Sequence, residues 1–249
     1  MQNTYYVDKG TYNFILGKEK MKIKEPAVGI CVSTFRRPGN LIKMLLQVKK
    51  RTLYQNYKVY IVIDHEEDKR TLKKIEESKI AEILPIEKIE MFPARVECVK
   101  VTNRDYSIGD EPYFVWLNDD MEVEEGWLQE AMKCMQTFPD KEGLVVFQDG
   151  IQDGRNACIG LISRNYIKTK LNGIFFNEIY KHYYADTELF RKSVWIHGVK
   201  YCPTAIVWHL HPTAKGIHKV KTDDIYTESM LLWGRDKEIF ILRKKDGFK

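Results

Sequence analysis

The sequence lacks any long apolar run of the kind that crosses a membrane. Its longest apolar stretches, such as VYIVI at 59–63, are far shorter than the roughly 20 residues that a membrane-spanning helix needs. The first residues also lack the pattern of a secretory signal peptide. These absences predict a soluble, cytoplasmic protein.

Cysteine is scarce and widely spaced. The five cysteines are an odd number with no close pair, which excludes a disulfide framework and a zinc knuckle. The chain also has no internal repeat, no low-complexity tract and no clear nucleic-acid recognition motif. We therefore expect no nucleic-acid partner. We expect most of the cysteines to be small core residues: Cys31, Cys98, Cys134, Cys158 and Cys202.

The charge balance is only mildly basic. Forty Lys and Arg residues against thirty-five Asp and Glu residues give a formal net charge of +5, and 44% of the 249 residues are hydrophobic, which is ample for a core. This basic excess fits a solvated surface or phosphate-bearing ligands. Lysines at 168–173 and 243–249 leave open a peripheral contact with an anionic membrane or an acidic glycan.

Strand-like and helix-like segments alternate from residue 27 onward. Residues 1–24 have no sustained period and predict a lead-in, either a short hairpin or an arm packed on a neighbour. The alternation after them predicts an α/β fold with a mainly parallel, twisted sheet flanked by helices. Strands are expected at AVGICVSTF (27–35), KVYIVID (58–64), YFVWL (113–117) and near KIEMFPA or ECVKVT; helices are expected at 41–51, 65–79 and 124–138.

Polar residues follow three of these strands. Ser33, Thr34 and Arg37 follow the first strand, Asp64 ends the second, and Asn118, Asp119 and Asp120 follow YFVWL. In parallel sheets, ligands bind at the carboxyl ends of the strands. An acidic pair there is either a solvated turn or helix cap, or it holds a positive group. Because polar residues follow three strands in turn, a ligand site is the favoured reading of the acidic pair. Mg²⁺ or Mn²⁺ would bind such carboxylates together with phosphate oxygens.

The second half of the chain adds further candidates. Asp186 in HYYADTELFRKSVW begins a predicted helix, so it is either a cap or a general base. Glu188 and Arg191 lie three residues apart on that helix and predict a surface ion pair. His209 and His211 in VWHLHP share one face of a strand, as candidate metal ligands.

The order of these motifs resembles the family-2 glycosyltransferases, enzymes of the GT-A fold. The resemblance is carried by STFRRP, VID, LNDD with GWL eight residues on, ADTEL and WHLH, and the tail at 223–243 is similar to the terminal helices of some members. It implies a Rossmann-like nucleotide-binding half and an acceptor half. The expected divisions are a lead-in (1–24), a GT-A domain (25–215) and a C-terminal helical extension packed on the same domain (216–249).

The resemblance also implies roles for individual residues. LNDD corresponds to the family's Asp-x-Asp motif, so Asp120 would be the main metal ligand and Asp119 would contact the donor. Asp186 corresponds to the catalytic base. His209 or His211 corresponds to a later metal-binding histidine. The remaining residues expected to bind the nucleotide or donor are Ser33, Thr34, Phe35, Arg37, Asp64, Arg104 and Asn118.

The sequence departs from the family pattern at two places. Many relatives have paired acids after the second strand and then Gly-Ser, whereas this chain has His65, Glu66 and Glu67 after Asp64. The first acid of the metal motif is Asn118, which leaves one fewer strong ligand, so the metal site is expected to be weaker or to depend more on a histidine.

The resemblance implies an inverting, Mn²⁺- or Mg²⁺-dependent, hexosyltransferase-like transfer of a sugar from a nucleotide-diphosphate donor, in particular a UDP-sugar, to a hydroxyl acceptor such as a glycan. Two other readings stay open at this point. A nucleotidyltransferase usually has a Gly- and Arg-rich phosphate loop, which STFRRPGN offers only in part. The other reading is a non-catalytic module that binds nucleotide sugars or glycans. The presence of Asp186 together with Asp120 and the histidines argues against it. The aromatic run NGIFFNEIYKHYY (172–184) fits either sugar stacking or a core.

Overall fold

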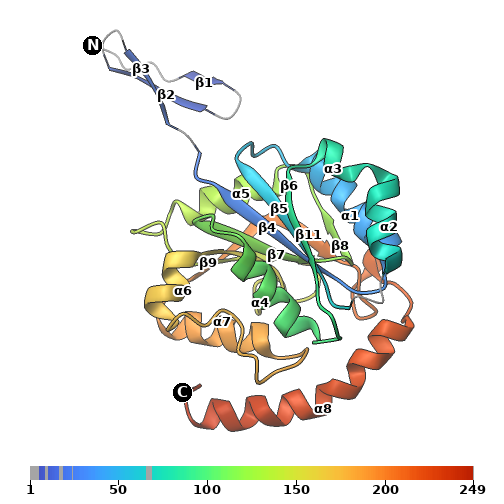
Figure 1. Ribbon diagram of the computed structural model, residues 1–249. Helices are drawn as coiled ribbons and strands as arrows, with labels where there is room; N and C mark the ends of the chain where they lie inside the picture. The colour runs from blue at the N-terminus through green and yellow to red at the C-terminus, as the bar shows by residue number, and fades with distance from the viewer. Residues whose placement is uncertain (1–5, 9–10, 17–18, 24, 66–68, 249) are drawn as a thin grey trace.

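The computed structural model describes residues 6–8, 11–16, 19–23, 25–65 and 69–248, with side chains described from residue 25 onward. Its central element is an eight-stranded sheet with the order β6-β5-β4-β7-β10-β9-β11-β8 (Figure 1). The strands are β4 (Val28–Thr34), β5 (Tyr57–Ile63), β6 (Ile86–Met91), β7 (Tyr113–Asn118), β8 (Met121–Val123), β9 (Leu144–Gln148), β10 (Gly160–Ser163) and β11 (Val199–His209).

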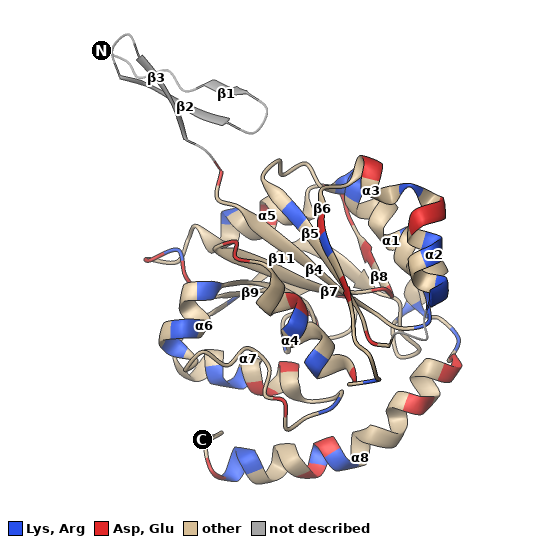
Figure 2. Ribbon diagram, in the orientation of Figure 1, with Lys and Arg blue, Asp and Glu red and all other residues tan. Residues whose placement is uncertain are grey.

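The first half of the sheet is parallel and lies around β4. Every residue of β4 is buried, and β4 pairs in parallel with β5 on one side and with β7 on the other. The uncharged sequence VGICVST explains this central place, because a strand covered on both faces cannot leave charges unpaired (Figure 2). The registers set Thr34 opposite Ile63 and Ser33 opposite Asn118. The polar residues that follow these strands therefore meet at one edge.

The second half of the sheet is mixed. Strand β10 is antiparallel to β7 and β9, β11 is parallel to β9, and β8 is antiparallel to β11. The last pairing sets Met121 opposite His209, and the Leu210 N–H donates to the Asp120 carbonyl at 2.8 Å. The short strand β8 therefore brings a histidine from residue 209 to the acidic pair at 119–120.

Helices cover both faces of the sheet and make a three-layer α/β/α arrangement (Figure 1). One core cluster joins α1 and α5 to Ile30, Val32 and their neighbours, and a second joins α4, α6 and α7 to the opposite face, which includes Cys31 and Phe114. The helices are α1 (Pro38–Arg51), α2 (Lys69–Ser78), α3 (Ile80–Ile83), α4 (Cys98–Ile108), α5 (Trp127–Met135), α6 (Arg164–Lys170), α7 (Ala185–Trp195), η1 (Gly216–His218) and α8 (Asp224–Lys245).

The predicted strands and helices are present, with two local differences. The strand predicted through VWHLHP ends at His209, so His211 lies outside it and the two histidines do not share one face of a strand. The short third strand is β6, which overlaps KIEMFPA, whereas ECVKVT belongs mostly to α4. Of residues 1–24, three segments form an antiparallel sheet, β1 (Tyr6–Asp8), β2 (Thr11–Leu16) and β3 (Glu19–Ile23), and the rest lie outside the described residues. No described helix combines the length and apolar character needed to cross a membrane.

The long helix α8 lies along one edge of the molecule, beside α7 and α4 (Figure 1). The Tyr184 and Phe240 rings stack with centroids 5.0 Å apart. The buried carboxylate of Asp236 accepts hydrogen bonds from the backbone N–H groups of residues 181, 182 and 183, the shortest at 2.9 Å. The terminal helix is therefore joined to the segment that precedes Asp186.

The expected surface ion pair of Glu188 with Arg191 is wrong. Glu188 is only 2% exposed, and its carboxylate accepts two hydrogen bonds of 2.7 Å from the Arg243 guanidinium of α8 and one of 2.9 Å from the Tyr180 hydroxyl. Arg191 is exposed and makes no ion pair with Glu188 in the structure. Spacing along one helix could not reveal a partner 55 residues away.

Replacing Arg243 by alanine should lower the free energy of unfolding by roughly 2–4 kcal/mol, because Glu188 then stays buried with only Lys192 as a cationic partner, at 3.6 Å. Chemical denaturation at neutral pH measures this loss. Arg191→Ala is the matched control and should change stability by less than about 0.5 kcal/mol. Equal losses in the two variants would contradict the assignment of the buried pair.

Candidate active site

A cleft of about 370 Å³ opens where β4, β5 and β7 end. Its walls come from the strand ends, from α4 and the start of α7, and from the first turns of α8. All the predicted site residues except Arg104 line it: Ser33, Thr34, Phe35, Arg37, Asp64, Asn118, Asp119, Asp120, Asp186, His209 and His211. The fold therefore brings into one cavity side chains that are up to 178 positions apart in the sequence, from Ser33 to His211.

Asp119 is held at the floor of the cleft. Its carboxylate is 4% exposed and accepts hydrogen bonds from the Thr34 hydroxyl at 2.7 Å and from the Phe35 N–H at 3.4 Å. Burial and the charge of Asp120 raise the pKa of Asp119 to about 7, against the opposing effects of Arg37 and Thr34. The acid that follows the strand is thus fixed in orientation by the loop after β4.

Asp120 faces His209. The Asp120 Oδ1 and His209 Nε2 atoms are 3.6 Å apart, and Oδ1 is buried with no hydrogen-bond partner within the described residues. Burial alone would raise the pKa of Asp120, but the charges of His209 and Arg37 outweigh it and hold that pKa below its ordinary value. The same carboxylate raises the pKa of His209, although burial opposes this.

This pair fits the requirements of a divalent cation. Two ligand atoms bound to one ion at about 2.1 Å lie roughly 3–3.6 Å apart, and the distance between Asp120 Oδ1 and His209 Nε2 falls in that range. Across residues 25–65 and 69–248, no group of three or more His, Cys, Asp or Glu side chains is arranged to hold a metal by itself. An ion here would therefore take further ligands from phosphate oxygens and water.

His211 lies beside His209, with ring centroids 5.0 Å apart, and makes contacts of its own. Its Nδ1 lies 2.7 Å from the Thr213 hydroxyl, and its ring packs edge-on against Tyr226 with centroids 5.1 Å apart. Burial lowers the pKa of His211, the opposite direction from His209. The two histidines therefore differ, and His209 is the one directed at Asp120.

Arg37 bridges the acidic pair to the terminal helix. Its Nη1 lies 3.4 Å from a carboxylate oxygen of Asp119 and of Asp120, and its Nε and Nη2 donate to Asp223 at 2.7 and 2.8 Å. Asp223 is also the N-cap of α8, since it accepts from the Tyr226 N–H at 2.7 Å. This guanidinium places a fixed positive charge at the acidic end of the cleft.

Asp64 and Phe35 form another part of the wall. The Asp64 carboxylate accepts from the N–H groups of Val96 and Glu97 at 2.7 and 3.2 Å, and burial raises the pKa of Asp64 to about 6. The Arg95 guanidinium lies over the Phe35 ring, 4.5 Å from its centroid. An aromatic ring beside an acid and an arginine offers a flat surface with polar groups at its edge. Glu66 and Glu67, which follow in the sequence, lie outside the described residues.

Asp186 begins α7 and is oriented by two neighbours. The Asn156 side-chain amide donates to its Oδ2 at 2.8 Å, and the Thr187 N–H donates to its Oδ1 at 2.8 Å. Burial raises the pKa of Asp186, and these hydrogen bonds limit the rise. The carboxylate is therefore both positioned and made more basic than an exposed aspartate.

Three non-glycine residues on or next to the cleft wall have left-handed backbone. Arg36, Glu97 and Tyr184 have φ values of +56°, +71° and +68°. Glu97 directs its N–H to Asp64, and Tyr184 directly precedes the first turn of α7 that carries Asp186. Such conformations cost roughly 1–3 kcal/mol each and persist where surrounding contacts enforce them.

Arg104 does not take part in the cleft. It lies on the exposed side of α4, where its guanidinium binds Glu90 at 2.5 and 3.0 Å. Residues 102 and 104 are separated by about 200° around a helix, so Thr102 and Arg104 point in opposite directions. Thr102 and Asp105, on the inner side, contact the Ser33 hydroxyl at 3.1 and 2.8 Å.

Several residues of the cleft were not predicted from the sequence. Helical spacing in CVKVTNRD could have indicated Thr102 and Asp105. The aromatic run at 172–184 left Phe176, Tyr183 and Tyr184 open as sugar-stacking or core residues without naming them as site residues, and no local pattern marks the others. Burial lowers the pKa of one of these, His182, to about 4, so it is neutral near pH 7. The unpredicted lining residues with polar or aromatic side chains are Arg95, Glu97, Cys98, Thr102, Trp116, Gln152, Asn156, Cys158, Phe176, His182, Tyr183, Tyr184, Thr187, Thr213, Tyr226, Ser229 and Trp233.

Comparison with known proteins agrees with this geometry. Residues 29–197 match the profile of glycosyl transferase family 2, and this span is more than half of the chain. The chain belongs to that family. Its curled sheet with flanking helices is the GT-A fold. A search of curated protein sequences finds no significant match.

Solved structures of other glycosyltransferases are similar in fold. TarS from S. aureus, residues 1–349, superposes with a TM-score of 0.61 at 15% identity, over 76% of this chain and 61% of that one. The mannosyltransferase PcManGT from Pyrobaculum calidifontis, solved with GDP-Man and Mn²⁺, gives 0.60 at 14% identity, over 74% of this chain and 56% of that one. TarS 1–349 solved with UDP gives 0.58 at 12% identity. The chain therefore matches less than two thirds of the length of each relative.

The link between Asp120 and His209 can be measured by titration. The pKa of His209 should lie above the ordinary 6.5 in the parent protein, because the charge of Asp120 raises it more than burial lowers it. In Asp120→Asn that charge is gone, so the pKa of His209 should fall. NMR of the imidazole C–H resonances measures both values. Asp64→Asn is the control and should leave the pKa of His209 unchanged. An unshifted value in Asp120→Asn would show that the two side chains do not interact.

Proposed function

We propose that the protein transfers a hexose, with inversion, from a nucleotide-diphosphate sugar to a hydroxyl group of an acceptor glycan, and that the transfer depends on Mn²⁺ or Mg²⁺. The observation that carries the proposal is the convergence of Asp119, the Asp120–His209 pair and Asp186 on one cleft. A UDP-sugar is the favoured donor. PcManGT with GDP-Man and Mn²⁺ and TarS with UDP are similar folds that bind this kind of ligand.

The nucleotide would bind at the ends of β4 and β5. Phe35, with Arg95 over its ring, provides a surface for a base, and Asp64 provides an acceptor for a base N–H. Asp119 would accept a hydrogen bond from the ribose or the donor sugar. Its burial is tolerable there, because its other oxygen atom already accepts from Thr34.

The diphosphate would lie at the acidic end of the cleft. Asp120 and His209 would hold the cation there, with Arg37 adding a second positive charge beside them. Bound Mn²⁺ or Mg²⁺ supplies electrostatic stabilisation of the negative charge that develops on the leaving diphosphate. Asn118, which stands where relatives often have an acid, adds a neutral donor and acceptor and no charge to this end.

Asp186 would act as the general base. It accepts the proton of the acceptor hydroxyl while that oxygen attacks the anomeric carbon and the bond to the diphosphate breaks. The hydrogen bonds from Asn156 and the Thr187 N–H hold the carboxylate in one orientation, and its raised pKa makes it a stronger base than a solvated aspartate. A buried base in a partly closed cleft also limits access of water to the donor.

An acceptor sugar ring fits the aromatic wall opposite the strands. Tyr183, Tyr184 and Trp233 line the cleft, and Phe176 also reaches it although it is buried, whereas Phe175 and Tyr180 of the same aromatic run lie wholly in the core. The run at 172–184 would therefore serve as core in part and as a sugar-stacking surface in part. Stacking of a sugar on such rings supports a glycan acceptor.

Asp186→Asn should lower sugar transfer by about 10²–10⁴ and leave donor binding intact, because the amide keeps the shape but accepts no proton. Turnover with the donor that gives the largest Mn²⁺-dependent thermal shift in a panel of nucleotide sugars measures the loss. Arg104→Ala, outside the cleft, is the control and should have parental activity. Full transfer activity in Asp186→Asn would exclude Asp186 as the base.

The same assay on the parent protein separates the alternative functions. Release of pyrophosphate in place of nucleoside diphosphate would indicate a nucleotidyltransferase, and donor binding without turnover would indicate a binding module.

Asp120→Ala and His209→Ala should each weaken Mn²⁺-dependent binding of UDP by at least about tenfold, whereas His211→Ala should have a smaller effect. Calorimetric titration of UDP with and without Mn²⁺ measures this. In the parent protein, Mn²⁺ binding should also weaken as the pH falls through the pKa of His209, since only the neutral imidazole binds a metal. Parental Mn²⁺ dependence in Asp120→Ala would rule out this metal site.

A further inference from the structure

The basic loop, residues 214–222 between β11 and α8, contains three lysines and no acid. Its sequence is AKGIHKVKT, and the lysines at 215, 219 and 221 are all exposed. None of them forms an ion pair within residues 25–65 and 69–248. Asp223, the first acid after the loop, is bound by Arg37. The basic loop therefore carries three positive charges that are available to an external partner.

An apolar side chain lies among these lysines. Ile217 is 91% exposed, more than any other large hydrophobic side chain that the structure describes, and Val220 of the same loop is 37% exposed. Ile217 is the middle residue of the short helix η1, and Gly216 before it has a φ of +62°. Glycine adopts such a backbone without strain, so the local sequence forms a tight turn that presents Ile217 to the outside.

The turn is fixed to the domain from below. The His218 ring stacks on the Trp208 ring of β11, with centroids 4.5 Å apart and an interplanar angle of 14°. The Trp208 Nε1–H donates in turn to Glu124 at 2.9 Å, and the Lys219 N–H donates to the Gly216 carbonyl at 3.3 Å. The basic loop therefore holds its apolar and cationic groups in a defined arrangement, so binding needs little further ordering of the chain.

An apolar side chain surrounded by lysines fits the surface of an anionic lipid bilayer. Acidic headgroups attract the lysines, and the apolar side chain gains by entering the boundary between headgroups and acyl chains. A soluble polyanion would pair with the lysines but would offer Ile217 no apolar surroundings. We propose that the basic loop binds an anionic membrane surface, with Ile217 inserted among the lipids and the three lysines against their headgroups.

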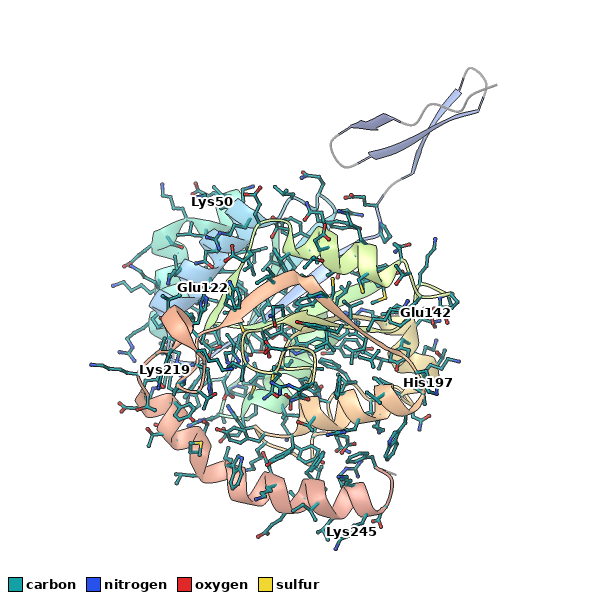
Figure 3. All side chains as sticks on the ribbon, turned by 180° about the vertical axis from the view of Figure 1, so that it is seen from behind. Lys50, Glu122, Glu142, His197, Lys219 and Lys245 are labelled. Atoms are coloured by element: carbon teal, nitrogen blue, oxygen red, sulfur yellow. The ribbon has the colours of Figure 1, made fainter. Side chains whose placement is uncertain are left out.

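Two other basic stretches of the chain fit a membrane less well. Lys168 and Lys170 belong to α6, which lies on the opposite side of the molecule from the basic loop (Figures 1 and 3). The exposed apolar residue that follows them, Ile174, is only 44% exposed. In the stretch at the end of α8, Arg243 is committed to the buried Glu188. The basic loop alone among these three stretches combines unpaired lysines with a fully exposed apolar residue.

The basic loop lies beside the mouth of the cleft. Thr213 and Ile225, on either side of the loop in the sequence, both line the cleft. Figure 3 labels Lys219 at the edge of the molecule, near the start of α8. A protein bound through this loop would therefore have its cleft close to the lipid headgroups. The proposal does not depend on which donor or acceptor the enzyme uses, so it can be tested without turnover.

Flotation of the full chain with lipid vesicles tests the proposal. Each lysine near an anionic surface contributes about fivefold to binding, so vesicles of phosphatidylcholine and phosphatidylglycerol at about 7:3 should bind the parent roughly 100-fold better than pure phosphatidylcholine. The double variant K219A/K221A should lose about 25-fold of this binding. Ile217→Ser, which keeps every charge, should lose at least about fivefold because no apolar side chain enters the bilayer. All three positions are exposed, so circular dichroism should report a parental fold.

Two matched controls should bind the anionic vesicles like the parent. K168A/K170A removes the same charge from α6, and Leu231→Ser removes an apolar side chain that is 83% exposed on α8. A parent with no preference for the anionic vesicles would overturn the proposal. So would parental binding by Ile217→Ser, which would leave only a general attraction of lysines for polyanions. Equal losses in K168A/K170A and K219A/K221A would also overturn it, because net charge alone would then explain the binding.

Discussion

Two adjacent carboxylates at the end of a buried strand impose the main physical constraint on this protein. Asp119 and Asp120 repel each other in a site where their carboxylates are largely buried, so the surrounding groups must offset that repulsion. Thr34 donates a hydrogen bond, Arg37 supplies a charge between the acids, and His209 approaches from β11. These groups come from different segments of the chain. The acidic pair therefore constrains three features at once: the loop after β4, the register of β8 on β11 and the start of α8.

Helix α8 belongs to this arrangement as much as the strands do. Its N-cap binds Arg37, its buried Asp236 accepts N–H groups from residues 181–183, and its Arg243 neutralises Glu188 under α7. These contacts fix the segment that leads into Asp186. The family match ends at residue 197, yet the wall of the cleft that faces the strand ends is supported by residues beyond it. Part of the site is thus built by residues beyond the span that matches the family model.

The sequence predicted those parts of the fold and site that depend on local pattern. Buried strands such as VGICVST and the polar residues after them have local signals, so Asp64 and Asp120 could be placed at the sheet edge correctly. Arg104, which the family resemblance implied to be near the donor, lies on the exposed side of α4, because a resemblance in sequence order does not fix direction around a helix. The partner of Glu188 was missed because tertiary packing brings Arg243 to it. Asn156 beside Asp186 had no signal, and the choice between His209 and His211 needed the pairing of β8 with β11.

The left-handed residues around the cleft have a consequence for attempts to engineer the enzyme. Glycine at Arg36, Glu97 or Tyr184 would remove backbone strain in the folded state, although it would also give the unfolded chain more freedom. Any gain in stability would come at residues that shape the cleft. Glu97 directs its N–H to Asp64, and Tyr184 precedes the first turn of α7. The same three residues thus carry both backbone strain and the geometry of the cleft wall, so a more durable variant is better sought at positions remote from them.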